Sequence, residues 1–231
     1  LQGPLSADLM AALVGEAVRA VPYYGLMEAE IAGVAVVVSQ TGFTGEKGYE
    51  IYVRDASLHA EKVWYQILGT GKEFGLEVVA PAHHRRIAAG IPSWGQDMDF
   101  ETSPFQVKLG YQVPRKKQAD YIGKQELESQ RTEIDAGRFP FKMKMVGLRL
   151  KGAPVTDYAS DFWLVSLPSG ERVGYVTSPW WSPELETNIA LARVPIESSE
   201  IGTELRVELP EPYAQPPGQP AHAVVCAVPF R

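Results

Sequence analysis

Ser39–Tyr52 reads SQTGFTGEKGYEIY, in which three glycines and two threonines lie directly before a strand-like run. Glycine lets the backbone take positive φ and approach a flat ligand closely, because it has no Cβ. The stretch lacks the GxxxxGK[ST] and GxGxxG fingerprints, and it leads into a strand rather than a helix N-terminus. This pattern argues against a nucleotide phosphate site. Two interpretations are left: a loop that approaches a ligand, or a tight connection without a function.

A carboxylate stands inside the strand-like run that follows the glycines. Side chains alternate along a strand, which places Tyr49, Ile51 and Val53 on one face and Glu50 and Tyr52 on the other. An ionised carboxylate only accepts hydrogen bonds, so Glu50 could accept two of them from adjacent N–H donors such as those of an aminopyrimidine. The alternative is an exposed glutamate on a half-solvated strand.

The composition is that of an ordinary globular protein. The 231 residues are 45% hydrophobic and 22% charged, which suits one large domain or two modest ones. A net charge of −6 argues against nucleic acid as a partner, because such binding relies on basic patches. No apolar run approaches the roughly 20 residues that a membrane span needs, so we expect no membrane association. The chain starts LQGPLSADLM, without methionine or a basic n-region. We therefore expect no signal peptide, and one interpretation is a fragment of a longer protein.

The chain has one cysteine, Cys226, which excludes an internal disulfide and a multi-cysteine zinc site. A single cysteine is compatible with a reducing compartment, and we expect a cytoplasmic protein. Cys226 lies in the apolar run AVVCAVPF. The simplest interpretation is therefore a small core residue, since free cysteine is among the most buried residue types.

Residues 1–131 predict an α+β region with a sheet and helices. We expect helices over about Ala7–Val21, capped by Ser6, over the stretch around Trp64, and over AHHRRIAAG. The strand-like runs are MEAEI and VAVVVS, joined in a hairpin by Ala32-Gly33, followed by YEIYV and LEVVAP.

From residue 142 the pattern changes to short strands separated by Gly, Pro and Ser turns. The strand-like runs are KMKMVGLRL, DFWLVS, ERVGYVTS, TNIALARV, TELRVEL and AVVCAVPF. They predict a small all-β barrel or sandwich over residues 142–231. A linker at 132–141 would join it to the α+β region. YIGKQELESQR predicts one more helix before the linker, and LPEPYAQPPGQP predicts an ordered surface loop.

Four basic or titratable side chains follow one another on the short helix predicted over AHHRRIAAG: His83, His84, Arg85 and Arg86. They must point in several directions, and Arg86 could aim inward and hold an anionic group bidentately, which lysine does less well. The alternative is a solvated helix face. The two histidines are adjacent rather than four residues apart, so they lack the spacing of a metal site on a helix, and we expect no metal.

An aromatic residue flanked by polar groups follows in SWGQDMD, which contains Trp94, Gln96 and Asp97. Trp94 could serve as a stacking platform, and the alternative is core packing. The basic run RKK at 115–117 is typical of a solvated loop, although it could attract a polyanionic tail. The sequence contains no G-x-S-x-G elbow and singles out no Cys/His pair. These residues together predict a cleft for a flat, partly anionic ligand.

Taken together, these segments resemble the aminomethyltransferase family: the T-protein of the glycine cleavage system and its relatives, which include folate-dependent demethylases. The matching motifs, in chain order, are LQGP, SQTGFTGEKGYEIYV, APAHHRRIAAGIPSWGQDMD, DYIGKQELE, MVGLRL, VGYVTSPWWSPEL, NIALARV and VPF. The resemblance covers nearly the whole chain and is specific to the superfamily, not to the substrate. It implies a partial T-protein-like folate-binding domain followed by a small C-terminal β domain.

The resemblance also implies tetrahydrofolate as cofactor and transfer of a one-carbon unit from a methyl or aminomethyl donor to N5 of the folate. By position in the motifs, Glu50 would read the pterin ring and Arg86 would hold the carboxylate end of the folate. The glycines before Glu50 would let the backbone approach the pterin. Tyr49, Tyr52 and Trp94 would be secondary wall residues of the site.

The sequence departs from the family pattern at three places. Gln40 stands where the family has arginine, Ala88 where it has glutamate, and Trp94 where it has tyrosine. These departures favour a small-molecule demethylase over an orthodox glycine-cleavage enzyme. Family members have about a further half-domain before LQGP, which bears the aspartate near N5, so no catalytic residue can be assigned here. We expect either a fragment or a cleft that a missing N-terminal segment or a second chain completes.

Three functions are therefore open. A one-carbon transferase would take an aminomethyl group from a lipoylated carrier protein and needs a docking surface near the cleft. A demethylase of a small O-, N- or S-methyl compound needs a closed pocket. A folate-binding module without turnover is the third, and an upstream acidic residue facing the cleft would argue against it.

Overall fold

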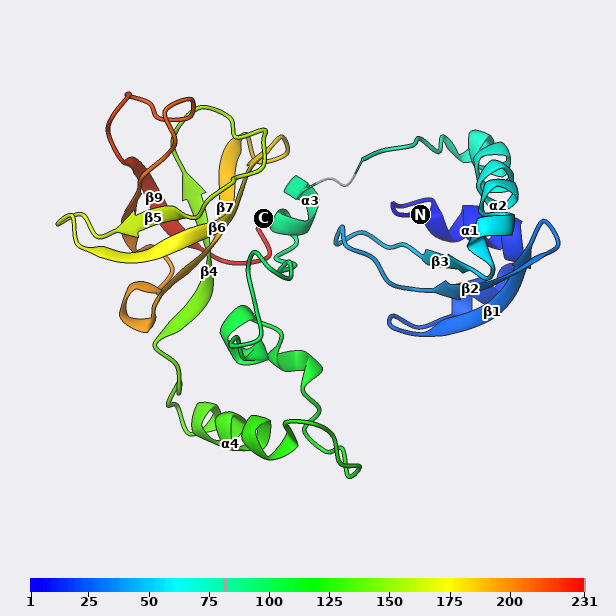
Figure 1. The fold of residues 1–231 in the computed structure, drawn as a ribbon, viewed down its shortest axis with the longest axis horizontal. Coiled ribbons are helices and arrows are strands. Elements are labelled where there is room, and N and C mark those ends of the chain that lie inside the picture. The colour runs from blue at the N-terminus through cyan, green and yellow to red at the C-terminus, as the bar shows by residue number, and fades with distance from the viewer. Residues whose placement is uncertain (81–82, 231) are drawn as a thin grey trace. The chain divides into compact units, whose positions relative to one another are not determined.

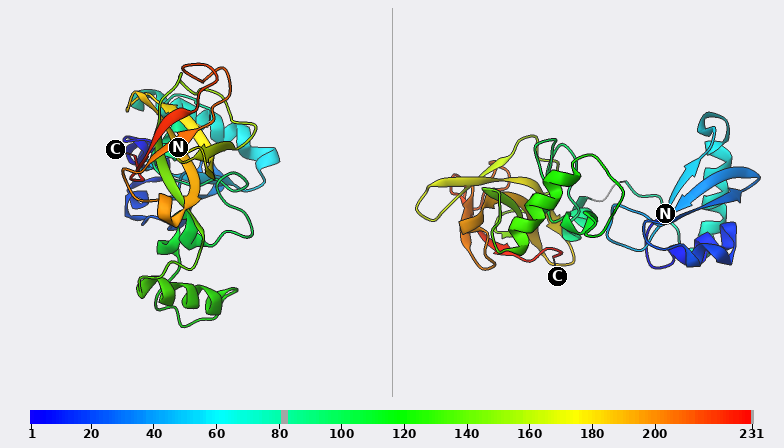
Figure 2. Two further views of the ribbon diagram at one scale, coloured as in Figure 1. Left: turned by 90° about the vertical axis from the view of Figure 1, so that its left-hand side faces the viewer. Right: turned by 90° about the horizontal axis from the view of Figure 1, so that it is seen from below.

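The computed structural model describes residues 1–80 and 83–230 of the chain. The chain forms two compact units, Leu1–Arg85 and Arg86–Arg231. The N-terminal unit holds a three-stranded sheet and the C-terminal unit a closed barrel (Figure 1, Figure 2). The expected α+β region followed by a small β-barrel is confirmed.

The N-terminal unit is an antiparallel sheet with two helices on one face (Figure 1). Its elements are α1 (Ser6–Val14), a 3-10 helix (Glu16–Ala20), β1 (Leu26–Ile31), β2 (Val34–Ser39), β3 (Glu50–Val53), α2 (Ala56–Gly71) and a 3-10 turn (Lys72–Phe74). β2 lies between β1 and β3. The sheet is therefore a meander in which consecutive strands are neighbours.

The hairpin predicted between the first two strands is confirmed. Ala32 and Gly33 have φ of 52° and 75°, the positive values that a two-residue hairpin turn needs to match the twist of its strands. The turn fixes a register in which Val34, Val36 and Val38 share one face and are almost fully buried. These valines form one core with apolar side chains of α1 and α2, so this face of the sheet is closed.

The first helix is shorter than the predicted Ala7–Val21. α1 ends before Gly15, whose φ of 91° takes the chain out of the helix, and the next turn is 3-10. Ser6 is not the cap: it lies inside the first turn, and its hydroxyl donates to the carbonyl of Lys47 at 2.9 Å. The serine therefore ties α1 to the glycine-rich stretch.

The strand predicted from LEVVAP does not form over residues 76–80, and residue 81 lies outside the described part of the chain. Val78 and Val79 are 64% and 77% exposed. An extended segment becomes a strand only when a neighbour completes its hydrogen-bond ladder. No strand of the described residues pairs with this one, so propensity alone did not suffice.

The C-terminal unit is a closed antiparallel barrel in the order β4-β7-β6-β5-β8-β9. Its elements are α3 (His83–Ala88, which begins at the end of the N-terminal unit), α4 (Lys124–Asp135), β4 (Met143–Leu150), β5 (Trp163–Ser166), β6 (Arg172–Ser182), β7 (Thr187–Pro195), β8 (Glu204–Val207) and β9 (Ala221–Cys226). Short 3-10 turns occur at Pro104–Val107, Gly110–Gln112 and Ile196–Ser198. All six predicted strand runs are therefore strands of one barrel, and the barrel alternative is correct. The Pro-rich stretch 209–220 connects β8 to β9, as predicted.

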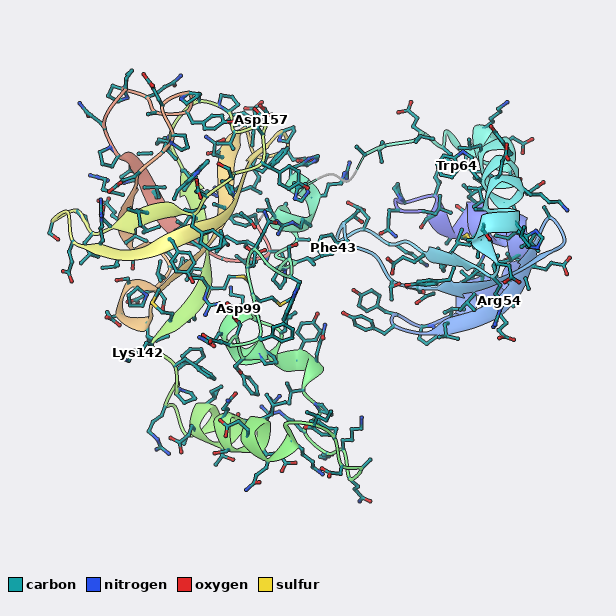
Figure 3. The ribbon with its side chains drawn as sticks, in the orientation of Figure 1. Phe43, Arg54, Trp64, Asp99, Lys142 and Asp157 are labelled. Carbon is teal, nitrogen blue, oxygen red and sulfur yellow. The ribbon has the colours of Figure 1, made fainter. Side chains whose placement is uncertain are left out.

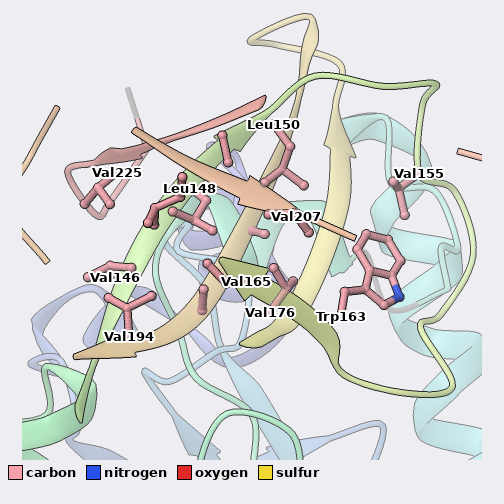
Figure 4. Packing of buried hydrophobic residues seen from close by; sticks show 14 residues of the cluster. Val146, Leu148, Leu150, Val155, Trp163, Val165, Val176, Val194, Val207 and Val225 are labelled. Carbon is pink, nitrogen blue, oxygen red and sulfur yellow. The ribbon is translucent and has the colours of Figure 1, made fainter. Parts of the chain in front are cut away.

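Figure 4 shows the interior of the barrel, which inward-facing side chains fill. Leu148, Val165 and Leu205 are completely buried and come from three different strands. Closure leaves no free sheet edge, and alternation sends every second residue inward. The barrel core is thus built from residues far apart in sequence.

The predicted linker at 132–141 is partly helical, because α4 continues to Asp135, and β4 begins at Met143. The prediction that residues 1–131 and 142–231 are separate domains stays a prediction. No helix in the described part of the chain is long and apolar enough to cross a membrane.

Cys226 offers a test of the packing at the end of β9. The side chain is half-buried against an apolar cluster, and burial raises the pKa of its thiol, an effect that Arg149 and Lys108 oppose. A raised pKa leaves less thiolate at pH 8. We expect the folded chain to react with a disulfide reagent about tenfold or more slowly than the urea-unfolded chain. Equal rates in the two states would contradict this packing.

Candidate functional site

The face of the N-terminal sheet that the helices do not cover carries the Glu50 side chain. Two cross-strand rows lie on it, which we call the open sheet face: Leu26, Ser39 and Glu50 in one row, and Glu28, Val37 and Tyr52 in the other. Leu26 and Tyr52 are 65% and 56% exposed. The face therefore presents aliphatic and aromatic surface beside a carboxylate.

The hydroxyl of Thr41 holds the Glu50 carboxylate at one end of this face. Thr41 donates its Oγ1–H to Glu50 Oε2. The Thr41 hydroxyl also lies 3.2 Å from Ser39 Oγ, and Ser39 donates to the carbonyl of Gly25 at 3.2 Å. Thr41 and Ser39 were not among the candidate residues predicted from the sequence. Their signal was present, because Ser39 is paired with Glu50 across the predicted strands and Thr41 follows two residues later.

The glycine-rich loop is shaped by a residue of the LQGP motif. A Cβ added at Gly42 or Gly48 would lie 2.1 or 2.3 Å from side-chain atoms of Gln2. The Gln2 amide donates to the carbonyl of Thr41 at 3.2 Å and accepts from the Thr44 hydroxyl at 2.8 Å. In this structure, then, the space at two of the glycines is filled by Gln2. The approach of a pterin to this loop stays a prediction.

The third glycine of the loop has a conformational role. Gly45 has φ of 78°, which is accessible to glycine without steric cost. Figure 3 labels Phe43 at the tip of this loop, where its side chain is 47% exposed. The loop thus carries an exposed aromatic side chain, and the side chain of Gln2 forms hydrogen bonds with the same loop.

Tyr49 lies on the other side of the sheet from Glu50. Its side chain is fully buried in the core with α1 and α2, and burial raises the pKa of its hydroxyl. Within the described residues that hydroxyl has no hydrogen-bond partner. The structure therefore brings Glu50 and Tyr52 together on one face and leaves Tyr49 beneath it.

Arg86 of α3 lies in the C-terminal unit, where it is 1% exposed. Its Nη1 donates to Asp97 Oδ2 at 2.9 Å and to the carbonyl of Ile91 at 3.2 Å. Its Nη2 donates to Gln96 Oε1 at 3.0 Å and to Ser178 Oγ at 2.8 Å. Burial lowers the pKa of the guanidinium, and Asp97 opposes that effect. The guanidinium thus donates to acceptors of its own unit.

Asp97 is the centre of this network and is 2% exposed. It accepts from the Ser93 amide at 2.7 Å, from the Ser178 hydroxyl at 2.7 Å and from the Thr177 hydroxyl. The network therefore joins α3, the loop 93–98 and strand β6. We call Arg86, Asp97, Thr177 and Ser178 the buried clamp.

The clamp holds the loop that carries Trp94. The Gly95 amide donates to the carbonyl of Met98 at 2.9 Å, with Gly95 at φ 82°. Trp94 is 56% exposed and meets the ring of Phe100 edge-on, with centroids 4.7 Å apart. Trp94 is therefore a surface aromatic on a fixed loop, not a core residue.

Two of the other candidate residues, His84 and Arg85, line an apolar pocket of the N-terminal unit together with Trp64 and Leu76. Arg115, in the basic run 115–117, pairs with Asp135 at 2.7 Å on the surface. Within residues 1–80 and 83–230, no group of three His, Cys, Asp or Glu side chains is placed to hold a metal ion.

Two family models cover most of the chain. The "GCVT N-terminal domain" matches residues 1–117, about half of the chain, and the "Glycine cleavage T-protein C-terminal barrel domain" matches residues 144–230. The chain belongs to the glycine cleavage T-protein family. The resemblance inferred from the motifs is thereby confirmed.

Curated relatives of this T-protein family chain are aminomethyltransferases. The one from Geobacillus sp. (strain WCH70) is 34% identical over 235 residues, which cover all of this chain and 59% of the relative. The one from Bacillus pumilus is 35% identical over 215 residues, with 90% of this chain and 55% of the relative covered. The chain thus spans somewhat more than half the length of these relatives.

A solved T-protein has the same fold. The glycine cleavage system aminomethyltransferase T from Bartonella henselae matches all of this chain and 58% of its own length, with a TM-score of 0.75 and 25% identity. The chain therefore shares the fold of a known family member over the matched part.

Proposed function

We propose that this chain is the folate-binding part of a tetrahydrofolate-dependent one-carbon transferase of the aminomethyltransferase type. The observation that carries the proposal is Glu50: its carboxylate lies on the open sheet face, held by Thr41, with Tyr52 on the next same-face position. A flat heterocycle with adjacent N–H donors matches that combination, because the carboxylate only accepts and the aromatic ring offers a stacking surface.

The chemistry asked of these residues is orientation. A pterin held at its edge by Glu50 and on its face by Tyr52 would present N5 to a one-carbon donor in a fixed position. Positioning can lower a barrier by several kcal/mol, up to about 7–11 for well-oriented reactions. Tyr49, beneath the sheet, would support the pterin surface rather than touch it.

The buried clamp supports a second part of the proposal. Trp94 as a wall residue of the site stays a prediction; its ring is exposed on a loop that Asp97 and Arg86 fix. Arg86 as a direct partner of the folate carboxylate stays a prediction, and the guanidinium would first have to exchange its present acceptors.

The one-carbon donor is a further proposal. The relatives carry the name aminomethyltransferase, which favours an aminomethyl donor on a lipoylated carrier protein. The departures at Gln40, Ala88 and Trp94 favour a small methylated compound instead. A folate-binding module without turnover is the remaining alternative. The predicted cytoplasmic location belongs to the same proposal.

Calorimetric titration with tetrahydrofolate tests the folate proposal. We expect Glu50→Ala to weaken binding about tenfold or more, which corresponds to about 1.4 kcal/mol, because the acceptor for the ring N–H groups is lost. Glu30→Ala is the matched control, since Glu30 is an exposed glutamate farther along the same face of β1. It should bind folate as the unchanged chain does.

Because the relatives are longer than this chain, the experiment has a second arm in which a longer chain is titrated. If the 231-residue chain does not bind tetrahydrofolate, the titration is repeated on a hybrid in which the upstream part of the Geobacillus relative precedes Leu1. Binding by the hybrid that Glu50→Ala weakens supports the proposal. Failure of the folded hybrid to bind, or equal effects of Glu50→Ala and Glu30→Ala, overturns it.

A further inference from the structure

Arg193 is a buried cation of the barrel wall that the proposed function does not use. It stands on β7, directly across from Tyr175 of β6 and Met145 of β4. It continues the outward-facing row of Ile189 and Leu191, whose side chains lie in the apolar cluster on the outside of the barrel. Arg193 is 8% exposed. A guanidinium therefore lies at the end of a row that otherwise buries aliphatic side chains.

Few hydrogen-bond acceptors of the described residues reach this side chain. Its Nη1 donates to the backbone carbonyl of Asp97 at 3.4 Å, which is long for such a bond. Its Nε is buried and has no hydrogen-bond partner in the described part of the chain. Arg193 also belongs to none of the ion pairs formed between described residues. A buried charge is costly unless a counterion and hydrogen bonds offset its lost hydration.

The carboxylate of Asp97 is committed elsewhere, although the Asp97 carbonyl lies over Arg193. It accepts hydrogen bonds from Arg86 and from the hydroxyl groups of Thr177 and Ser178. A β-bulge brings both hydroxyls to it, since the register of β6 against β7 shifts at this point. Bulges re-aim side chains and are frequent beside functional sites. The charge of Asp97 therefore serves the buried clamp rather than Arg193.

The second carboxylate of this loop is Asp99, which Figure 3 labels. It accepts from the Thr102 hydroxyl at 2.7 Å and from the Glu101 amide at 3.0 Å. These bonds lower the pKa of Asp99, and the charge of Arg193 adds a smaller effect in the same direction. Asp99 thus lies in the field of the cation without forming an ion pair with it.

The loop over Arg193 also exposes two aromatic rings. Trp94 is 56% exposed and Phe100 is 96% exposed, and their rings meet edge-on with centroids 4.7 Å apart. Phe100 therefore contributes almost no burial to the stability of the folded chain. A cation without a counterion and an apolar surface on the same loop together suit a ligand that carries an anionic group on a flat ring.

We propose that Arg193 is the anion receptor of a binding site for an aromatic carboxylate at the loop 94–102. A guanidinium offers parallel N–H donors that fit the two oxygens of a carboxylate. Trp94 and Phe100 offer the ring of the ligand a stacking surface. All of these residues belong to the C-terminal unit, and the inference does not depend on the folate proposal.

The stability of Arg193→Met tests whether the guanidinium lacks a partner. Replacing a buried charge without a counterion by an apolar side chain removes its desolvation cost. We therefore expect Arg193→Met to leave the melting temperature unchanged or to raise it. Arg86→Met is the contrasting variant, because it leaves Asp97 without its cation, and it should lower the melting temperature by about 4 °C or more. A comparable fall for Arg193→Met would reveal a structural partner and overturn the proposal.

Benzoate is the probe for binding, and benzamide is its uncharged control of similar shape. We expect benzoate to raise the melting temperature of the unchanged chain by about 2 °C or more above the effect of benzamide at equal concentration. In Arg193→Met this difference should disappear. Arg172→Met, at an exposed arginine of the same barrel, is the matched control and should respond as the unchanged chain does. Equal effects of benzoate and benzamide on the unchanged chain, or an undiminished benzoate effect in Arg193→Met, overturn the proposal.

A carboxylate from the part of the relatives that this chain does not span is the competing partner of Arg193. The hybrid with the upstream part of the Geobacillus relative before Leu1 separates the two cases. We expect the hybrid to keep the benzoate response and to tolerate Arg193→Met. If Arg193→Met destabilises the hybrid and benzoate has no effect on it, the guanidinium is paired within the longer fold and the proposal is wrong.

Discussion

Asp97→Asn is expected to lower the free energy of unfolding of the C-terminal unit by about 3–5 kcal/mol. The substitution keeps the volume of the side chain and removes its charge. Arg86 is 1% exposed and depends on that charge. A buried cation without its counterion keeps its desolvation cost and loses the attraction that offset it. Urea unfolding followed by tryptophan fluorescence measures the loss.

Asp161→Asn is the matched control, because Asp161 is an exposed carboxylate of the same unit. It should change stability by less than about 0.5 kcal/mol. The double variant Arg86→Met with Asp97→Asn separates the ion pair from the rest of the clamp. It should cost less than the sum of the two single variants by about 0.5–3 kcal/mol. Additive costs would mean that the pair contributes no coupling.

Leu148→Ala is the second large effect, at about 2–5 kcal/mol of destabilisation. Leu148 is fully buried inside the barrel, where its backbone pairs with Ala190 on one side and Val225 on the other. A closed barrel collapses little around a missing side chain, because each strand is fixed by two neighbours. Most of the cavity should therefore remain, together with its cost.

Ile201→Ala removes an apolar side chain from the same unit, but that side chain is 68% exposed. It should cost less than about 0.5 kcal/mol. The comparison is made by urea unfolding of both variants under the same conditions. A cost for Leu148→Ala as small as that for Ile201→Ala would show that the barrel interior repacks freely.

Much of the fold was predictable because its signals are local. The Ala32-Gly33 turn between two valine-rich runs fixes the β1–β2 hairpin, and period-two alternation puts Glu50 and Tyr52 on one face. The six barrel strands are each bounded by turn residues. The pattern left open whether they form a sandwich or a barrel, since closure depends on which strands become neighbours.

The candidate site was only partly predictable. Alternation placed Glu50, and the polar residues around Trp94 drew attention to that loop. The hydrogen bond from Thr41 to Glu50 forms only because of the way the chain turns after β2. The side chain of Gln2 fills the space beside Gly42 and Gly48 only because the N-terminal residues lie against the loop. Neither contact has a periodic signal.

The sequence by itself determined the order of the elements, the faces of the strands and the membership of the T-protein family, because these follow from turns, alternation and motifs. Only the tertiary structure decided that Arg86 is buried and paired with Asp97, since the clamp that encloses them also contains Ser178, 92 positions from Arg86. Only the tertiary structure shows that 76–80 pairs with no strand among the described residues. In both cases the deciding groups are supplied by, or are missing from, other parts of the fold, and local propensity carries no information about them.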